Sequence, residues 1–340
     1  MATASDRTRW PQLAAATAVV GAVSGLRFFR RRRRHRGPAD IGERRRVQLD
    51  PNPTGAGLVL LVNTGAGSAG DLADELRGAL PDAEVQALDE PDELPDRLAA
   101  AAAREDVSII GIAGGDGSVS AAAAVAAERM LPVMAVPGGT LNHLTRDLGL
   151  GTAEDAVGAV AGGTAVEVDL PSIGGRPFLN TASFGSYAEL VDAREALEDD
   201  IGKWPAMAVA GWRVLRRGTP IEVELDGRAR SLWMIFIGNC RYAPDGFAPS
   251  RRTRLDDGVL DIRLIDASHP FCRTRMIIGL ITGRLGRSPV YSQWSATELS
   301  VRSTTGSLRL ACDGETFDGG DHAEVVKTGR RIVLYAAPPD

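Results

Sequence analysis

Cysteine is scarce in this chain and follows no recognisable pattern. The three cysteines are Cys240, Cys272 and Cys312, an odd number without any CxxC spacing. A disulfide framework needs paired thiols, and a zinc site needs closely spaced ones. The sequence therefore argues against both kinds of site and indicates a reduced compartment.

A net positive charge is found only in the N-terminal part of the chain. Residues 1–46 contain 12 Arg and 3 acidic residues, which gives a net charge of +9. Of the totals of 39 basic and 44 acidic residues, 27 and 41 are then left for residues 47–340, a net charge of −14. Because the phosphate backbone of a nucleic acid repels an acidic body, we do not expect a nucleic-acid partner.

The basic N-terminus combines an apolar stretch with an arginine cluster. Residues 10–29 are mostly apolar, and residues 30–36 are arginines apart from one histidine. About 20 helical residues just cover a bilayer core, and basic residues after such a stretch favour the cytoplasmic side. We expect an anchor on an anionic membrane surface, at the cytoplasmic face of the cell membrane. A disordered basic tail is the alternative, and residues 37–55, with three prolines, are expected to be a linker.

Strand and helix signals alternate between residues 56 and 169. We expect strands at 57–63, 85–88, 107–112 and 133–136 and helices at 71–80, 94–104 and 120–129. This alternation is typical of a doubly wound parallel sheet with helices on both faces. In such a sheet the ligand lies beyond the carboxyl ends of the strands, so the loops at 63–70, 113–118 and 137–142 are predicted to line one cleft.

The pattern changes after Asp169. Residues 170–340 contain β-like runs and two helical intervals, at about 187–217 and 274–283. We therefore predict an α/β fold class with two domains after the arm of residues 1–55. A doubly wound nucleotide-binding domain covers 56–169, and a mainly antiparallel β-sandwich covers 170–340 and completes the cleft.

The first glycine-rich loop, residues 65–70, has three readings. Its GxGxxG spacing follows a strand, and Asp89 lies 19 residues after Gly70, as in a dinucleotide-binding fingerprint. A small-residue turn explains the same letters. A nucleotide phosphate loop would use the same backbone N–H groups.

The second glycine-rich loop, Gly114–Ser118, carries a carboxylate. Its N–H groups are expected at the positive end of a helix, where phosphate binds. Asp116 would be repelled there unless it reaches a Mg²⁺ ion that the phosphates also bind. The chain contains no GxxxxGK[ST] loop, which excludes a P-loop enzyme. A chance GGDG turn is the alternative.

Five motifs occur in an order that resembles the diacylglycerol kinase catalytic family, which includes bacterial lipid kinases and sphingosine and ceramide kinases. They are GGDGS at 114–118, PGGTLNHLTRDLGL at 137–150, FLNTASFG at 178–185, LDDGVLDIRLI at 255–265 and DGE at 313–315. The resemblance covers about residues 57–337. It implies a fold like that of NAD kinases, with the active site between an α/β domain and a β-sandwich.

The resemblance also implies the cofactors and the site residues. ATP would be the phosphoryl donor and Mg²⁺ the metal. The implied nucleotide-binding residues are Asn63, Thr64, Gly65, Ala66, Gly67, Asp89, Gly114, Gly115, Asp116, Gly117, Ser118, Val119, Ser120 and Thr140. Asp257 and the carbonyl groups of Arg254 and Val259 match a structural magnesium site. Thr64 stands where the family usually has Pro, and His143 where it usually has Asp.

The catalytic carboxylates are expected near the C-terminus. Glu315 matches the proton acceptor of the family, with Asp313 beside it, and Asp116 completes the catalytic set. Phosphorylation of an alcohol needs a base at the hydroxyl and metal charge on the γ-phosphate. The roles of Glu315 and Asp313 could be exchanged, and a surface hairpin turn is the alternative for this segment.

These observations leave four functional hypotheses. The leading one is an ATP-dependent kinase that phosphorylates a membrane lipid alcohol such as diacylglycerol. The others are a soluble-metabolite kinase of the NAD-kinase type, an NAD-dependent oxidoreductase built on Gly65–Gly70, and a nonenzymatic nucleotide- or lipid-binding protein. A homodimer is compatible with the sequence, which does not indicate the oligomeric state.

Overall fold

The computed structural model describes residues 45–63, 69–88, 90–139, 142–185, 219–243, 251–282 and 284–338. Several predicted features lie outside these ranges. They are the membrane arm before residue 45, most of the 63–70 loop with Thr64, Gly65, Ala66 and Gly67, the positions of Asp89 and Thr140, and the whole helical interval at 187–217. These predictions stay predictions.

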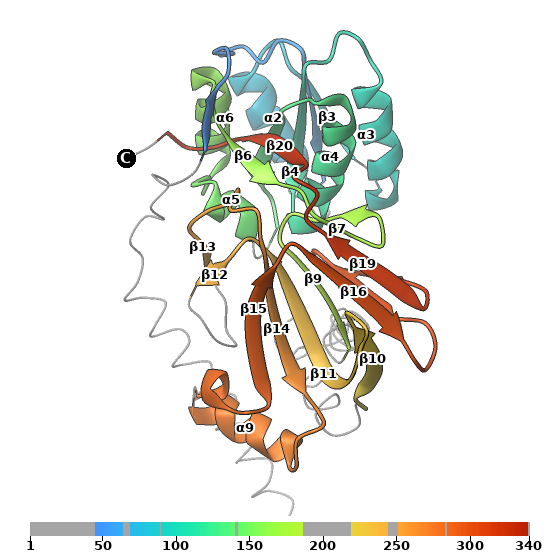
Figure 1. Ribbon diagram of the computed structural model, residues 1–340. Coiled ribbons are helices and arrows are strands. Elements are labelled where there is room, and N and C mark those ends of the chain that lie inside the picture. Colours follow the sequence, from blue (N-terminus) through green and yellow to red (C-terminus); the bar gives the residue numbers. More distant parts are fainter. Residues whose placement is uncertain are drawn as a thin grey trace, which may run out of the picture.

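The first domain is built on a seven-stranded mixed sheet (Figure 1). Its strands, in spatial order, are β1 (Arg46–Gln48), β6 (Thr164–Asp169), β20 (Arg331–Tyr335), β5 (Val133–Pro137), β4 (Ile109–Gly114), β2 (Leu58–Val62) and β3 (Glu84–Ala87). The pairs from β3 to β20 are parallel, whereas β6 pairs antiparallel with both β20 and β1. β2 and β4 are buried along their whole length, as strands covered on both faces should be.

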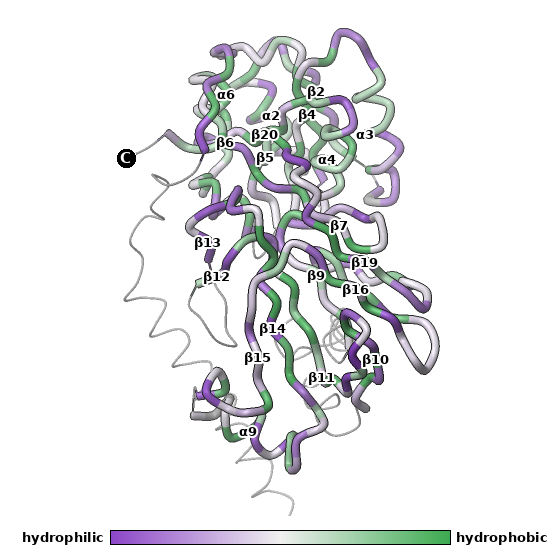
Figure 2. Tube along the Cα trace, viewed as in Figure 1, coloured by the Kyte–Doolittle hydropathy of each residue, from purple (hydrophilic) through white to green (hydrophobic). Residues whose placement is uncertain are grey.

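Helices cover both faces of this sheet. They are α2 (Ala69–Ala79), α3 (Leu94–Ala102), α4 (Asp116–Arg129), α5 (His143–Asp147) and α6 (Ala153–Gly162). α3 packs against α4 and α2 packs against α6. The alanines of α4 at positions 122, 123 and 126 are fully buried, so this helix lies close to the strands. Figure 2 shows the apolar strands of this sheet between polar outer surfaces.

The second domain is a curled antiparallel sheet of eleven strands. The chain of paired strands runs β18 (Glu315–Asp318), β17 (Arg309–Cys312), β9 (Thr181–Gly185), β11 (Arg228–Asn239), β10 (Ile221–Leu225), β16 (Glu298–Ser303), β19 (His322–Val326), β7 (Ser172–Ile173) and β8 (Arg176–Pro177). β14 (Leu260–Asp266) pairs with β11 and with β15 (Tyr291–Ala296). A separate ribbon joins β12 (Tyr242–Ala243) to β13 (Arg251–Arg252). The predicted fold class, an α/β domain followed by an antiparallel β domain, is confirmed.

Two segments lie in a different sheet or element than expected. β20 was placed with the second domain but occupies the middle of the first sheet, between β5 and β6. β1 lies within the expected linker and forms the edge strand of the same sheet. The chain therefore crosses between the domains twice, after Asp169 and again after Val326. The apolar alternation of β20 is compatible with either sheet, so only the tertiary pairing decides its place.

α9 (Cys272–Thr282) lies at the end of the second domain that is farthest from the first domain (Figure 1). Its small core, which includes Trp233, Cys272 and Met276, is separate from the two large cores. None of the helices in the described ranges has both the length and the apolar composition that crossing a bilayer requires.

Candidate active site between the two domains

The loops at 113–118 and 137–142 meet at the carboxyl edge of the first sheet, as predicted, and Asn63 lies beside them. Asn63, directly after β2, donates from Nδ2 to Ser118 Oγ at 3.0 Å. The N–H of Gly138, after β5, donates to the carbonyl of Gly114 at 3.0 Å. The two backbones approach so closely that a Cβ atom on Gly139 would lie 2.6 Å from Gly115 Cα. Glycine is therefore required where these loops touch.

α4 begins inside the loop at 113–118. Gly115 is its extended N-cap residue, and Asp116 lies in its first turn. The side chain of Val119 is in the hydrophobic core, whereas Gly115 to Ser118 are half-buried at the start of the helix. Free N–H groups at a helix start attract anions, so this edge can hold phosphate.

The Asp116 carboxylate already has three donors. Its oxygens accept from the backbone N–H groups of His143 and Leu144 at 3.1 and 3.0 Å and from Asn180 Nδ2 at 3.2 Å. Asp116 therefore fastens the start of α5 and the second domain to the glycine loop. The sequence did not reveal this anchoring role, although Asn180 lies in the FLNTASFG motif.

Asp313 is held by a ring of donors. Its carboxylate accepts from the N–H groups of Leu179, Asn180 and Thr181 at 2.7, 2.9 and 2.8 Å and from the hydroxyl of Ser120. Burial raises the pKa of Asp313, and the four donated hydrogen bonds oppose that shift. Ser120 belongs to α4, so Asp313 joins the two domains. Its oxygens are engaged by the protein itself.

Glu315 has a different environment two residues later. Its side chain is 58% exposed and forms an ion pair with Arg176, whose guanidinium lies 4.9 Å from the Phe317 ring centroid. One Glu315 oxygen would lie 3.2 Å from a Cβ atom on Gly117. An open carboxylate therefore lies against the start of α4. Arg176 was not singled out from the sequence.

A buried arginine joins the domains behind this edge. The Arg252 side chain is fully buried, and its Nε donates to Asp147 at 2.8 Å. Its terminal nitrogens donate to the Leu179 carbonyl at 2.6 Å and to Asn180 Oδ1 at 2.7 Å. This burial excludes both a contact of Arg252 with lipid headgroups and a place on a solvated turn. Distant residues enclose it, and the local sequence carries no sign of that.

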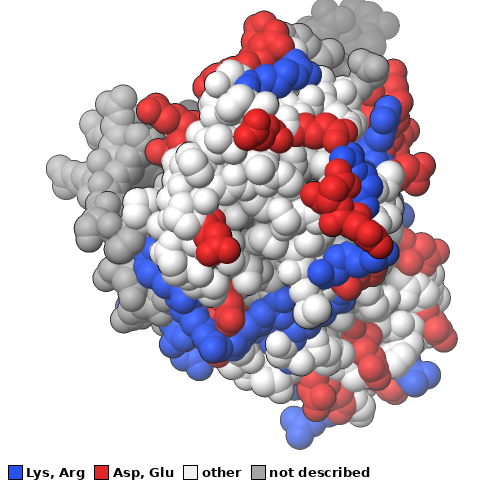
Figure 3. Space-filling model, turned by 90° about the horizontal axis from the view of Figure 1, so that it is seen from above, with Lys and Arg blue, Asp and Glu red and all other residues white. Residues whose placement is uncertain are grey.

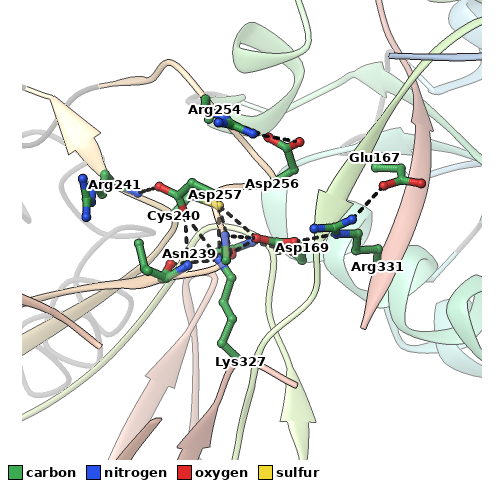
Figure 4. A network of polar contacts seen from close by, with 12 residues as sticks. Glu167, Asp169, Asn239, Cys240, Arg241, Arg254, Asp256, Asp257, Lys327 and Arg331 are labelled. Carbon is green, nitrogen blue, oxygen red and sulfur yellow. Dashed lines mark hydrogen bonds and ion pairs between the residues drawn. The ribbon is translucent and has the colours of Figure 1, made fainter. Parts of the chain in front are cut away.

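The predicted structural magnesium site lies around Asp257 and Val259. Asp257 accepts from the N–H groups of Arg241 and Val259 at 2.9 and 3.1 Å. The Val259 carbonyl, a predicted metal ligand, accepts from Lys327 Nζ at 2.9 Å. The Arg254 side chain pairs with Asp256. Figure 4 shows Lys327 reaching into this group of oxygens, beside Asp169 and Cys240.

The titration of His143 gives a testable pH dependence. Burial lowers the pKa of His143 below its ordinary value of 6.5, and the nearby Asp116 and Asp147 carboxylates only partly oppose this. Below pH 6.5 the unfolded chain therefore binds a proton that the folded chain resists, so stability falls as the pH drops. We expect urea unfolding to show a weaker pH dependence for His143→Gln than for the wild type between about pH 7.5 and 5.

An unchanged pH slope in that variant would show that His143 does not cause the pH dependence of stability.

Asp169 affects the stability of the fold at a lower pH than His143 does. Burial alone would raise its pKa, but Lys327, the Gly258 N–H and Arg331 outweigh burial and lower it below 3.8. Its contribution is present above that value and is lost only as the pH falls further.

Part of the chain matches a known protein family. Residues 57–173 match the diacylglycerol kinase catalytic domain. A protein named "Probable lipid kinase YegS-like" from Pseudomonas syringae is 29% identical over 217 residues, 61% of this chain and 69% of that protein. An uncharacterized Synechocystis protein is 28% identical over 268 residues, 75% of this chain and 61% of that protein.

Solved structures share the fold. Two crystal structures of Bacillus anthracis proteins have TM-scores of 0.63 and 0.56 at 22% and 19% identity. Each match covers 83% of this chain and 97% of the other, and the second protein is described as a diacylglycerol kinase. Residues 57–173 are thus a domain of the diacylglycerol kinase catalytic family, and the chain is a homologue of YegS-like lipid kinases.

Proposed function

We propose that this protein transfers the γ-phosphoryl group of ATP to the hydroxyl group of a membrane lipid, with diacylglycerol or a related lipid alcohol as the acceptor. The observation that carries the proposal is the position of Glu315. This exposed carboxylate lies against Gly117, at the helix start where the phosphate would bind. A base next to the transferred phosphate is the arrangement that phosphorylation of an alcohol requires.

Each part of the site has a proposed role. The N–H groups of the Gly114–Ser118 loop would hold phosphate, while Glu315 accepts the proton of the attacking hydroxyl. Arg176, paired with Glu315, orients the carboxylate and adds positive charge beside the phosphate. Asp313 positions the turn that carries Glu315. It does not take the proton, because its carboxylate oxygens already accept four hydrogen bonds from the protein.

Mg²⁺ is proposed to accompany the nucleotide at Asp116. Each oxygen of this carboxylate already accepts one or two N–H groups. A carboxylate oxygen can accept about two bonds, so Asp116 fits an ion through a bound water better than by direct ligation. When bound, the ion would neutralise charge on the β- and γ-phosphates.

Asp116→Asn tests this role. The amide nitrogen would replace one carboxylate oxygen and face one of the two N–H groups of α5, so we expect a loss of about 1–3 kcal/mol in the free energy of unfolding. We also expect turnover to fall at least about 10²-fold, or roughly 2.7 kcal/mol of barrier. Turnover at saturating Mg²⁺ and urea unfolding measure the two effects. Normal turnover with reduced stability would make Asp116 only an anchor of α5.

The decisive assay for the function uses radiolabelled ATP and mixed lipid vesicles, with the products separated by chromatography. We expect label in a phosphorylated lipid. Label in NAD or another soluble metabolite would contradict the lipid proposal, and the absence of any transfer would contradict the kinase proposal. Assays on vesicles that each contain one lipid alcohol then name the acceptor.

Membrane attachment through residues 10–36 remains part of the proposal. Full-length protein is expected to sediment with anionic vesicles to a larger extent than a chain starting at Arg45, which keeps β1 but lacks the apolar stretch and the arginine cluster. Equal partitioning of the two chains would contradict an N-terminal anchor.

We propose no nucleic-acid partner. Figure 3 shows mixed charge on one face of the molecule, where a band of basic side chains lies among acidic ones.

A further inference from the structure

The side chain of Lys327 ends in a cluster that resembles a metal site. The ligand atoms of Asp169, Cys240 and Asp257 all lie within 4.8 Å of one another. Lys327 Nζ is 3.1 Å from Asp169 Oδ2, 3.2 Å from Cys240 Sγ and 3.9 Å from Asp257 Oδ1. The ammonium group therefore lies among the same atoms that could hold an ion.

The geometry around Lys327 suits an ammonium group. Its three hydrogens have three oxygen acceptors: Asn239 Oδ1 at 2.7 Å, the Val259 carbonyl at 2.9 Å and Asp169 Oδ2 at 3.1 Å. Magnesium would need oxygens at about 2.0–2.1 Å in octahedral geometry. Only 2% of the Lys327 side chain is exposed, so the charge is withdrawn from water and needs these partners.

The charges of the cluster already balance. The carboxylates of Asp169 and Asp257 face the cations of Lys327 and Arg331, which donates to Asp169 Oδ1 at 3.0 Å. A divalent ion added here would leave an excess of two positive charges. Lys327 is also one of only two lysines beside 37 arginines in this chain. A compact ammonium group can take the place of an ion, whereas a planar guanidinium cannot.

We infer that Lys327 supplies, as part of the chain, the cation that the family resemblance places at Asp257 and Val259, so that this site binds no divalent ion. The ammonium joins Asp169 at the end of β6, Asn239 at the end of β11, Val259 before β14, and its own segment between β19 and β20. The ammonium group thereby stabilises, without a metal ion, both segments in which the chain passes from one domain to the other.

Thermal unfolding without nucleotide tests this inference. We expect wild-type Tm to be the same in EDTA and in millimolar Mg²⁺ or Ca²⁺. Lys327→Ala opens the space, so its Tm should fall in EDTA and recover by about 5 °C or more with a saturating divalent ion. Lys327→Met fills the space without charge and should be destabilised with no recovery. Arg331→Ala, which removes a half-exposed cation from the same Asp169, is the matched control and should show no divalent response.

A wild-type Tm that drops in EDTA, or a divalent ion retained at this site by purified wild type, would overturn the inference. So would a Lys327→Ala variant that folds but gains nothing from divalent ions. The wild-type measurements decide the matter even if Lys327→Ala does not fold. None of these measurements involves turnover, so they are independent of the proposed kinase activity.

A second observation concerns the outer surface of α9. Phe271, Ile277 and Ile278 are 81%, 40% and 55% exposed, which is unusual for large apolar side chains. Four exposed arginines, at 273, 275, 284 and 287, lie in the same segment. Residues 267–297 contain no acidic residue, although residues 47–340 as a whole carry a net charge of −14.

We propose that α9 docks on an anionic lipid surface, a proposal that rests on the proposed action on a membrane lipid. Apolar side chains can enter the interface while arginines pair with lipid phosphates, as in amphipathic interfacial helices. A protein partner would have to be strongly acidic to match the same charge. α9 also lies at the end of the β domain that is farthest from the first domain (Figure 1).

An environment-sensitive fluorophore on Ile278→Cys in the full chain tests this docking. The native cysteines are all buried, so the new thiol is labelled selectively. We expect a blue shift with phosphatidylglycerol-containing vesicles and little change with pure phosphatidylcholine. Met130→Cys, at a 90% exposed site in the first domain, is the control and should stay unshifted.

A protein that sediments with vesicles while the label at 278 stays in water would overturn the docking surface. Equal shifts on both kinds of vesicle would overturn the role of the arginines. The label reports without ATP, so an inactive kinase and a wrong docking surface give different results.

Discussion

Replacement of Glu315 by Gln is expected to abolish most phosphoryl transfer. The amide keeps the size of the side chain but cannot accept the proton of the acceptor hydroxyl. Loss of a general base typically costs about 10²–10⁴-fold in rate. The side chain is exposed, so the free energy of unfolding should change little. Turnover on lipid vesicles, together with nucleotide affinity by calorimetry, measures the effect. Affinity is expected to stay near the wild-type value.

Two further variants make the result specific. Glu298→Gln changes an exposed glutamate at the start of β16 and should leave turnover unchanged. Asp313→Asn would replace one of the two acceptor oxygens by an amide donor that faces at least one backbone N–H group, so its main effect should be a loss of stability of about 1–3 kcal/mol. If Glu315→Gln is active and Asp313→Asn is stable but inactive, the two roles are exchanged. If both variants are active, this segment is not catalytic.

Replacement of Arg252 by Met is expected to give the largest loss of stability. The variant leaves Asp147 without its buried partner and Asn180 Oδ1 without this donor, while the Leu179 carbonyl keeps its hydrogen bond from Asn239 Nδ2. Removal of one partner of a buried ion pair costs about 3–5 kcal/mol. Urea unfolding should show the loss, and activity should fall with it because Asn180 also contacts Asp116.

The neighbouring arginine is the control for this experiment. Arg251 is exposed on the same strand, and Arg251→Met should change the free energy of unfolding by less than about 0.5 kcal/mol. The double variant Arg252→Met/Asp147→Leu removes both charges, so it should be more stable than Arg252→Met alone. If Arg251→Met and Arg252→Met cost the same, Arg252 does not hold the two domains together.

The sequence determined the parts of this protein that depend on local pattern. Short apolar runs and small residues placed β2, β4 and β5 and the starts of the glycine-rich loops after β4 and β5, because buried strands and tight turns need those residue types. A parallel sheet brings the ends of its strands together, so the sequence also predicted that Asn63 and Gly114–Ser118 share one edge. The order of the motifs was enough to indicate the family.

Only the tertiary structure decided what long-range packing controls. β20 could belong to either domain by its pattern, and its pairing with β5 and β6 placed it in the first sheet. Asp313 and Glu315 are alike as letters, yet one is surrounded by four donors and the other is open to solvent. Lys327 stands 68 residues from Val259 and 158 from Asp169. No local pattern can encode those distances, because burial and charge pairing arise only when distant segments meet.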